Sequence, residues 1–445
     1  MSQTQPAKSK NVFPWLTGIG LFIVPALCGA TTYYVSTSGN DANPGTALNA
    51  PFRTLKFSLA KLSAGDTLYM RGGTYNEIIE SHNGANFPSG TSWSNPVTIT
   101  PYQQEQVTLY GRMSIGRENP LTQYLIFDGI SFDGKGAIPY DAVSINGGSH
   151  HIRFINGEVK NSVSTAGLSA NHHNDANPGA PSFIEIINMD IHHNGLDASY
   201  YTEVHRAAHR HGLYLAISGI LVEGSRIHDN GGCGIHQNTS QRIKDTIYRN
   251  NRIWNNGTCG VIITGSDNAL VSNNVVWGNT TGIAVSSIKD PKGPKVYNNT
   301  VYGNSYQGIN VSQPLWGNNG PFDTLVYNNI SYNNLQDLFD GGINTTQGNN
   351  LLGINPFFVD AGNRDFHLTS QSPARDAGRT LDEVKTDIDG RLRSKDGVYD
   401  IGAYEFGDGE ITPPPVEPPR SEPPVVPEAP TLANSNTLMT HSGNF

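Results

Sequence analysis

Histidine is concentrated in one part of this 445-residue sequence. Eleven of the fourteen histidines lie between His150 and His236, interspersed with arginine and tyrosine. A guanidinium group can hold a carboxylate through two hydrogen bonds, and histidine and tyrosine can accept or donate protons. These residue types suit a reaction beside a carboxylate, in which a base removes the proton next to the carboxyl group and an acid protonates a leaving oxygen.

Individual residues in this region can be given roles in that chemistry. Arg206 and Arg210 are expected to bind the carboxylate. The base is expected to be Lys160 or one of three histidines, and the acid Tyr214 or Tyr201. The three histidines are His205, His209 and His211. The predicted catalytic residues are Arg206, His209, Arg210, His211, Tyr214 and Lys160. The predicted substrate-binding residues are His172, His173, Tyr201, His192, His228, His236 and Asn238. The histidine pairs could also bind a transition metal, but no ordered ligand spacing identifies a metal site.

The elements that position these residues are indicated by a sequence repeat between 221 and 334. Short β-branched runs alternate with Asn and Gly turns, and no helical spacing recurs. The copies begin at Gly224, Asn250, Asn273, Asn298 and Asn328. Repeats this short cannot bury a core alone and must stack, so we predict an all-β, single-stranded parallel β-helix. One asparagine per repeat should form a ladder of hydrogen bonds between coils. Its expected members are Asn230, Asn256, Asn279 and Asn304.

Alignment of the coils places outward side chains in columns. One column contains Lys160, His192, His228, Trp254, Trp277 and Tyr302. A second contains Ser169, Tyr214, His236, Ile262, Ala284 and Asn310. The alignment places insertions at 170–181 and 195–210 over one face near Tyr214 and His236. Long loops on a compact solenoid are usually functional, so this face is the expected site. The predicted catalytic side chains of the second insertion and of the strand after it should face outward.

The N-terminal part of the sequence resembles a known family. A strand is expected at 33–36, followed by a short helix, because Phe52, Leu55, Leu59 and Leu62 recur at helical spacing. The stretch 33–46, the Gly-Asp-Thr at 65–67 and the Gly-Gly-Thr-Tyr at 72–75 resemble the cap of secreted right-handed β-helix proteins of the pectate-lyase-like superfamily. The family nine pectate lyases show the most similar form. The helix should cover the open end of the stack.

This resemblance implies a right-handed coil, an acidic polysaccharide as partner and calcium as a cofactor. The aspartate cluster that binds calcium in those lyases is not found in this sequence. The segment 211–214 also resembles a strand of mannuronan epimerases, although their Asp-Pro-His motif is absent. We therefore predict a polysaccharide lyase acting by β-elimination on a pectate- or alginate-like chain. The alternatives are a non-catalytic cell-surface protein that binds glycans or mediates adhesion, and a uronate epimerase.

The two ends of the chain indicate export. Lys8 and Lys10 precede an apolar run, and the small residues at 28–30 suit cleavage of a signal peptide. A membrane anchor is the alternative; after cleavage the protein would be secreted or at the cell surface and not integral to the membrane. The C-terminal sequences SPARDAG, DIDGRLR and DIGAYE resemble the closing segment of surface-anchored bacterial β-helix proteins, and we expect a cap held by Asp and Arg pairs. Nine of the 20 residues at 411–430 are proline, which predicts an extended linker.

The predicted divisions are a signal peptide at 1–30, an N-terminal cap with the first coils at 31–96, the β-helix at 97–356, the closing segment at 357–406 and a linker and tail at 407–445. The net charge of −9 argues against nucleic acid as a partner. We expect a monomer. Cys233 and Cys259 each precede the repeat glycine, so they should lie in equivalent places on successive coils. We predict a disulfide between them, with two stacked thiols as the alternative.

Overall fold

The structure is a computed structural model that describes residues 29–117, 121–136, 140–163, 165–171, 180–196, 210–238, 241–312, 319–393 and 398–407. The described residues up to Phe406 belong to one compact unit, and a second unit begins at Gly407. The predicted signal peptide and tail therefore lie almost entirely outside the described residues. Within the described part of the chain, no helix is long and apolar enough to cross a bilayer.

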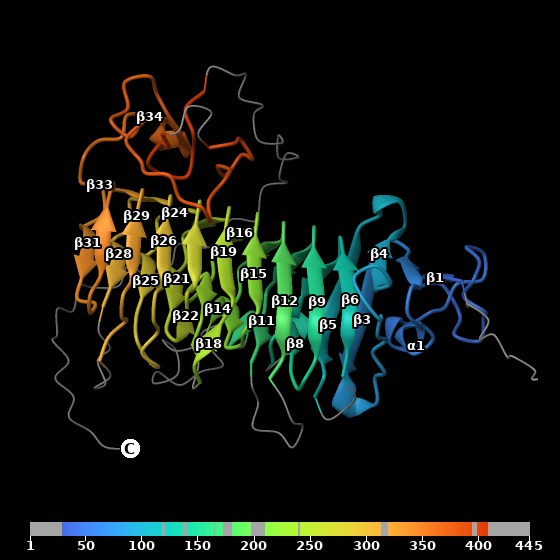
Figure 1. The fold of residues 1–445 in the computed structure, drawn as a ribbon. Coiled ribbons are helices and arrows are strands. Elements are labelled where there is room, and N and C mark those ends of the chain that lie inside the picture. Colours follow the sequence, from blue (N-terminus) through green and yellow to red (C-terminus); the bar gives the residue numbers. More distant parts are fainter. Residues whose placement is uncertain are drawn as a thin grey trace, which may run out of the picture. The chain divides into compact units, whose positions relative to one another are not determined.

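Parallel strands stack in three runs along the chain (Figure 1). The first run is a 12-stranded sheet of β1 (Thr32–Val35), β2 (Thr67–Met70), β4 (Val97–Pro101), β6 (Gln123–Asp128), β9 (His150–Ile155), β12 (Ser182–Ile187), β15 (Ile220–Glu223), β19 (Thr246–Arg249), β23 (Leu270–Ser272), β26 (Lys295–Tyr297), β29 (Leu325–Tyr327) and β32 (Thr346–Gly348). The second run is β7 (Ser131–Asp133), β10 (Glu158–Lys160), β13 (Asp190–His192), β16 (Arg226–His228), β20 (Arg252–Trp254), β24 (Val275–Trp277), β27 (Thr300–Tyr302), β30 (Ile330–Tyr332) and β33 (Leu351–Leu352).

The third run is β8 (Val143–Ile145), β11 (Ala166–Ala170), β14 (His211–Leu215), β17 (Ile235–His236), β21 (Cys259–Ile263), β25 (Thr281–Val285), β28 (Gln307–Val311) and β31 (Gln336–Asp340). The long strands β3 (Gly73–Glu80) and β5 (Val107–Ile115) begin both of these runs and join them into one 19-stranded sheet. A small pair, β18 (Ile243–Lys244) and β22 (Ser266–Asp267), lies in the turn after the third run. The predicted parallel β-helix is confirmed, and each coil from β6 to β31 contributes one strand to each of the three runs.

Alternation along the strands sends one set of side chains into a continuous core. In the coil formed by β15, β16 and β17, the inward side chains are Val222, Ile227 and Ile235, each 0% exposed. The same pattern continues in one buried apolar cluster from Val35 to Val326. Fully burying a side chain of this size contributes about 1.5–3 kcal/mol. The stack is therefore stabilised mainly by contacts that each coil makes with the next.

The predicted capping helix is present as α1 (Leu55–Leu59). It begins after Thr54, whose side-chain hydroxyl accepts a hydrogen bond from the Phe57 N–H. Leu55 and Leu59 are buried in the core at the N-terminal end of the stack. Short 3₁₀ turns occur at Ser81–Asn83, Tyr102–Gln104, Gly134–Gly136 and Ala361–Asn363.

Asparagine side chains connect the coils at both turns that flank the second run. After that run, Asn230 Nδ2 donates to Asn256 Oδ1 at 2.9 Å, and Asn256 Nδ2 donates to Asn279 Oδ1 at 3.1 Å. This ladder confirms the prediction and extends it to Asn194 and Asn334. A second ladder, which was not predicted, lies before the second run. Its members are Asn251, Asn274, Asn299, Asn329 and Asn350.

The predicted disulfide joins Cys233 to Cys259. The two cysteines lie on successive coils, just before Gly234 and Gly260. The cross-link therefore connects the same two coils as the bond from Asn230 to Asn256.

The segment 357–406 packs along the flank of the coils. Its antiparallel pair, β34 (Phe358–Asp360) and β35 (Asp365–Leu368), is visible beside the coils in Figure 1. Phe366 of this pair lies 5.7 Å from the ring of Trp277 and 5.2 Å from that of Tyr302. These aromatic contacts bury part of the first outward column, so the segment covers a side of the later coils.

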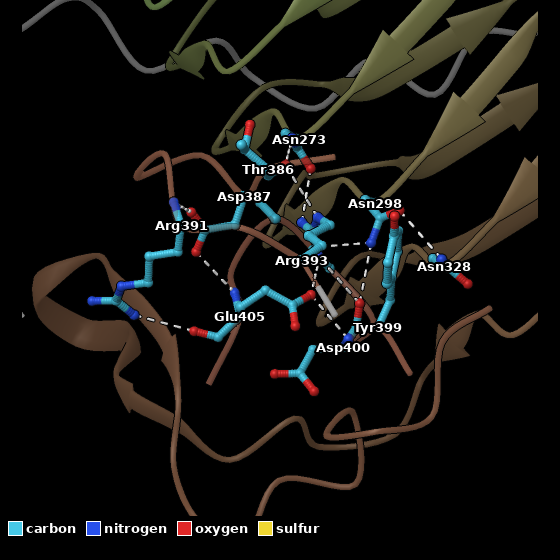
Figure 2. Close-up of polar contacts among 12 residues, drawn as sticks. Asn273, Asn298, Asn328, Thr386, Asp387, Arg391, Arg393, Tyr399, Asp400 and Glu405 are labelled. Carbon is cyan, nitrogen blue, oxygen red and sulfur yellow. Dashed lines mark hydrogen bonds and ion pairs between the residues drawn. The ribbon is translucent and has the colours of Figure 1, made fainter. Parts of the chain in front are cut away.

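Arg393 is fully buried at the centre of this contact (Figure 2). Its Nη2 donates to Asn273 Oδ1 and to the Gly402 carbonyl, both at 2.8 Å, and its Nη1 pairs with Glu405. From the coils, the Nδ2 of Asn298 also donates to the Gly402 carbonyl of the segment. The ion pair of Arg393 is with a glutamate of the same segment. A pair of the expected Asp and Arg kind joins Arg252 of β20 to Asp389 of the segment at 3.4 Å.

At pH 8, where Glu405 is ionised, replacing Arg393 with Met should destabilise the protein by about 3–5 kcal/mol, because it leaves a buried carboxylate and the Asn273 amide oxygen without their cation. Urea unfolding of the two proteins measures this difference. Arg391→Met is the matched control, since Arg391 is only half-buried and donates to a single carbonyl, that of Glu405. Equal losses in the two variants would contradict a special role for Arg393.

The same contact should make stability depend on pH. Burial raises the pKa of Glu405 to about 7; the Arg393 charge opposes this rise and Asp400 adds to it. The native state therefore holds a proton that the unfolded state releases above its model value of 4.5. Stability from this group is present below pH 4.5 and is lost as the pH rises to about 7. Thermal melts between pH 4.5 and 8 should show this loss in the native protein and a smaller one in Glu405→Gln. Identical profiles would exclude Glu405 as the source.

Candidate functional site

Both predicted outward columns exist in the structure. In the first column, Lys160 pairs in register with His192, and His192 with His228. In the second, Ser169 pairs with Tyr214, and Tyr214 with His236. The first column belongs to the second run of strands and the second column to the third run. The turn between them contains the Asn194 ladder and the insertion at 195–210.

The side chains of the first column form ion pairs with carboxylates on the same strand, on the preceding strand of the run or just after the strand. Lys160 Nζ lies 2.6 Å from Glu158 Oε2, and His192 Nε2 lies 2.7 Å from Glu158 Oε1. His228 lies 2.9 Å from Asp190 and 2.7 Å from Asp229. The histidine rings stack at 5.1 Å, and His228 stacks on the ring of Trp254 at 4.1 Å.

These ion pairs shift the pKa values of Glu158 and His228. Burial alone would raise the pKa of Glu158, but hydrogen bonds from His192, Lys160 and Ser131 outweigh it and lower that pKa to about 2. Burial would lower the pKa of His228, but its bonds to Asp190 and Asp229 raise it instead. His228 is also only 1% exposed. Because Lys160, His192 and His228 are all ion-paired with carboxylates, this column stabilises the stacking of the coils.

Three predicted residues, His211, Tyr214 and His236, lie together at the second column. The ring of His236 stacks on His211 at 4.0 Å and lies 5.4 Å from Tyr214. Burial raises the pKa of Tyr214, so its phenol keeps its proton at neutral pH. Arg210 precedes this strand and is half-buried. Its Cβ lies so near Gly195 that a side chain on Gly195 would collide with it, since an added Cβ would come within 2.0 Å.

The prediction that His211 faces outward was wrong. His211 is 1% exposed, and its Nδ1 accepts a hydrogen bond from the Cys233 N–H at 3.0 Å. The ring fits there because Gly232 has no side chain; a Cβ at that position would lie 2.7 Å from His211 Nδ1. His211 therefore supports the turn that contains the disulfide.

A pocket of about 560 Å³ lies at the turn after the third run. Two predicted residues, Tyr214 and Asn238, line it. Arg242 and Lys289 also line it and were not predicted. Arg242 forms a two-point ion pair with Asp267 at 2.6 and 2.8 Å, whereas Lys289 is exposed and forms no ion pair within the described ranges. Register pairs His236 with Ile262 and Ile262 with Ala284, so Asn238 lies two residues beyond its reference position and Lys289 lies five. Alignment of the strands therefore did not bring Lys289 into the predicted site.

The insertion at 170–181 enters and leaves beside this pocket, because Asn171 and Ala180 line it. Five predicted site residues lie outside the described residues. They are His172, His173, Tyr201, Arg206 and His209. The structure thus brings together Tyr214, His236 and Asn238 and places Lys160, His192 and His228 on a different column.

A buried ion pair that was not predicted lies on the third run near its N-terminal end. Glu80 Oε1 lies 2.9 Å from Arg112 Nη1, and both side chains are less than 8% exposed. Glu80 pairs in register with Ser114, and Ser114 with Ser144. The outward positions of this run are therefore polar from Glu80 to His236. They turn apolar at Ile262, the register partner of His236.

Among the described residues, no group of three His, Cys, Asp or Glu side chains is placed to hold a metal ion. The carboxylates nearest the two columns, those of Glu158, Asp190 and Asp229, are already paired with Lys160, His192 and His228. Calcium prefers six to eight oxygen ligands. These residues do not fit a calcium site, and the chemistry considered below uses side chains of the chain alone.

The sequence and the fold were compared with those of known proteins. The family model described as right-handed β-helix region matches residues 166–372. The chain is 26% identical over 339 residues to the uncharacterized protein YwoF of Bacillus subtilis (strain 168), covering 68% of each chain. It is 35% identical over 89 residues to pectate lyase PEL9 of Emericella nidulans, covering 20% of each. The crystal structure of pectate lyase Pel9A matches with a TM-score of 0.62 at 18% identity, over 86% of this chain and 98% of that one. The chain therefore contains a right-handed β-helix region and has the same fold as pectate lyase Pel9A, as its N-terminal sequence implied.

Proposed function

We propose that this protein is an exported polysaccharide lyase that cleaves a uronic-acid chain by β-elimination. The observation that carries the proposal is the pocket that contains Tyr214, Asn238 and the exposed cation Lys289 on a chain with a net charge of −9. Local positive charge beside a proton donor suits a carboxylated sugar. The relationship to pectate lyase PEL9 supports the same substrate class.

In this proposal, each step is assigned to a residue of the chain. Lys289 holds the carboxylate and stabilises the charge that grows as the neighbouring carbon loses its proton. His209, outside the described residues, takes that proton. The carbon–oxygen bond to the next sugar breaks, a carbon–carbon double bond forms, and the phenol of Tyr214 gives its proton to the leaving oxygen. The products are an unsaturated uronide and a shortened chain.

A non-catalytic glycan-binding protein is the second candidate. It is favoured by the ion pair that occupies Lys160 and by the burial of His211, because both remove a predicted base from the surface. Such a protein would bind polysaccharide and release no unsaturated uronide. An epimerase would change the uronic-acid configuration without shortening the chain.

Tyr214→Phe should lower the rate of unsaturated uronide formation by about a hundredfold or more, because it removes only the proton that the leaving oxygen needs. The assay is the new ultraviolet absorbance on pectate, alginate or a glycosaminoglycan, with thermal melts to check folding. Tyr306→Phe, at an exposed tyrosine on a later coil, is the matched control. Full activity in Tyr214→Phe would remove Tyr214 from the mechanism. Absence of product from the native protein would favour the binding protein or the epimerase.

Lys289→Gln should weaken the binding of an acidic polysaccharide by about fivefold at low salt, since it removes one exposed charge contact worth about 1 kcal/mol. The loss should shrink as the salt concentration rises. Binding titrations at two ionic strengths measure both effects. Lys385→Gln, on the segment that packs on the flank, should leave the affinity unchanged. An equal loss in both variants would point to a general charge effect.

A further inference from the structure

A stack of aromatic rings lies on the first run of strands, at the corner where three successive coils enter it. The rings of Tyr124 and His151 lie 4.7 Å apart, and those of His151 and Phe183 lie 4.8 Å apart, with interplanar angles of 28° and 21°. Trp93 meets Tyr124 edge-on at 5.4 Å. Tyr124, His151 and Phe183 are each the second residue of their strand, in β6, β9 and β12.

The backbone at this corner is unfavourable for aromatic residues. Tyr124, His151 and Phe183 have φ values of 49°, 55° and 53°, in the left-handed region that bulky residues rarely adopt. The next coils have Gly219, Asp245 and Asn268 at the same corner, with φ values of 73°, 59° and 53°. Glycine, aspartate and asparagine accept this conformation at little cost. The fold itself therefore does not need aromatic rings at the corner.

The stack ends in an open ring face. The position after Phe183 along the stack is Gly219, which has no side chain, and a Cβ there would lie 2.9 Å from Phe183 Cδ1. Phe183 is consequently 50% exposed. Its chain neighbour Ser182 and Gly219's neighbour Ser218 both line the pocket that contains Tyr214. The exposed ring thus borders that pocket.

We propose that Phe183, supported by His151 and Tyr124, is a platform for one sugar of a polysaccharide whose neighbouring sugars enter the pocket. A pyranose ring has an apolar C–H face that packs on an aromatic ring, and two aromatic rings behind Phe183 hold it in place. Arg153, the cation beside this stack, covers Trp93 at 4.3 Å and is paired with Glu185. The platform therefore binds the apolar face of a sugar and leaves carboxylate binding to the pocket. This inference rests on the proposed function to the extent that the pocket also holds sugars.

Phe183→Asn tests the platform without straining the fold, because asparagine occupies this corner in a later coil. Its melting temperature should equal or exceed that of the native protein. Its affinity for long polygalacturonate or alginate chains should fall about three- to tenfold, the range expected for one aromatic contact. Binding of a uronic-acid disaccharide, which fits the pocket alone, should not change. Phe339→Asn, at an exposed phenylalanine on β31, is the matched control and should keep full affinity.

Two further variants test whether the aromatic face of Phe183 is needed or only an apolar side chain. Phe183→Tyr keeps an aromatic face and should retain the native affinity, whereas Phe183→Leu keeps an apolar side chain and should lose affinity as Phe183→Asn does. Unchanged long-chain binding in Phe183→Asn would overturn the platform, and so would equal losses in Phe183→Tyr and Phe183→Leu. A native protein that binds polysaccharide without cleaving it would overturn the lyase and leave the platform to be judged by these variants. A native protein that binds neither polymer would overturn both.

Discussion

Every feature of this molecule depends on each coil lying directly above the next, and the asparagine ladders are the interaction that enforces it. Asn256 Oδ1 accepts from both the backbone N–H and the side-chain amide of Asn230. One oxygen therefore satisfies two buried donors at a turn where no strand partner exists. Because a slip of one residue would break the ladder and turn core side chains outward, the ladder and the core specify the same register. The disulfide joins two of the coils that this register aligns.

That register also decides what the outward residues can do. In the first column, the short strands place a carboxylate two residues before the cation, as in Glu158 and Lys160, so the charges neutralise one another. In the second column, the neighbours of Tyr214 are Ser169 and His236, which leave its phenol beside a pocket. Residues of similar type thus support the fold on one run and line a candidate binding site on the next. A strand's position in the coil determines this difference more than the residue type does.

The repeat period was enough to predict the strands, one asparagine ladder, both columns and the disulfide, because each follows from stacking equivalent positions. The fate of single side chains was harder to predict. His211 is buried because Gly232, in the next coil, makes room for its ring, and no periodic pattern encodes such a fit. Arg393 binds Asn273 across 120 residues, so local sequence did not indicate the contact. Lys289 was missed because the turn after the third run varies in length from coil to coil.

The functional proposal depends on where an acidic polysaccharide meets this surface. The most direct measurement is a crystal structure of the protein with an oligogalacturonate or an oligomannuronate bound. We predict sugar density in the pocket lined by Tyr214 and Asn238, with a carboxylate near Lys289 and the chain continuing toward Phe183. Sugar bound along the column of His228 and Trp254, or on the flank covered by the segment 357–406, would contradict the proposed site.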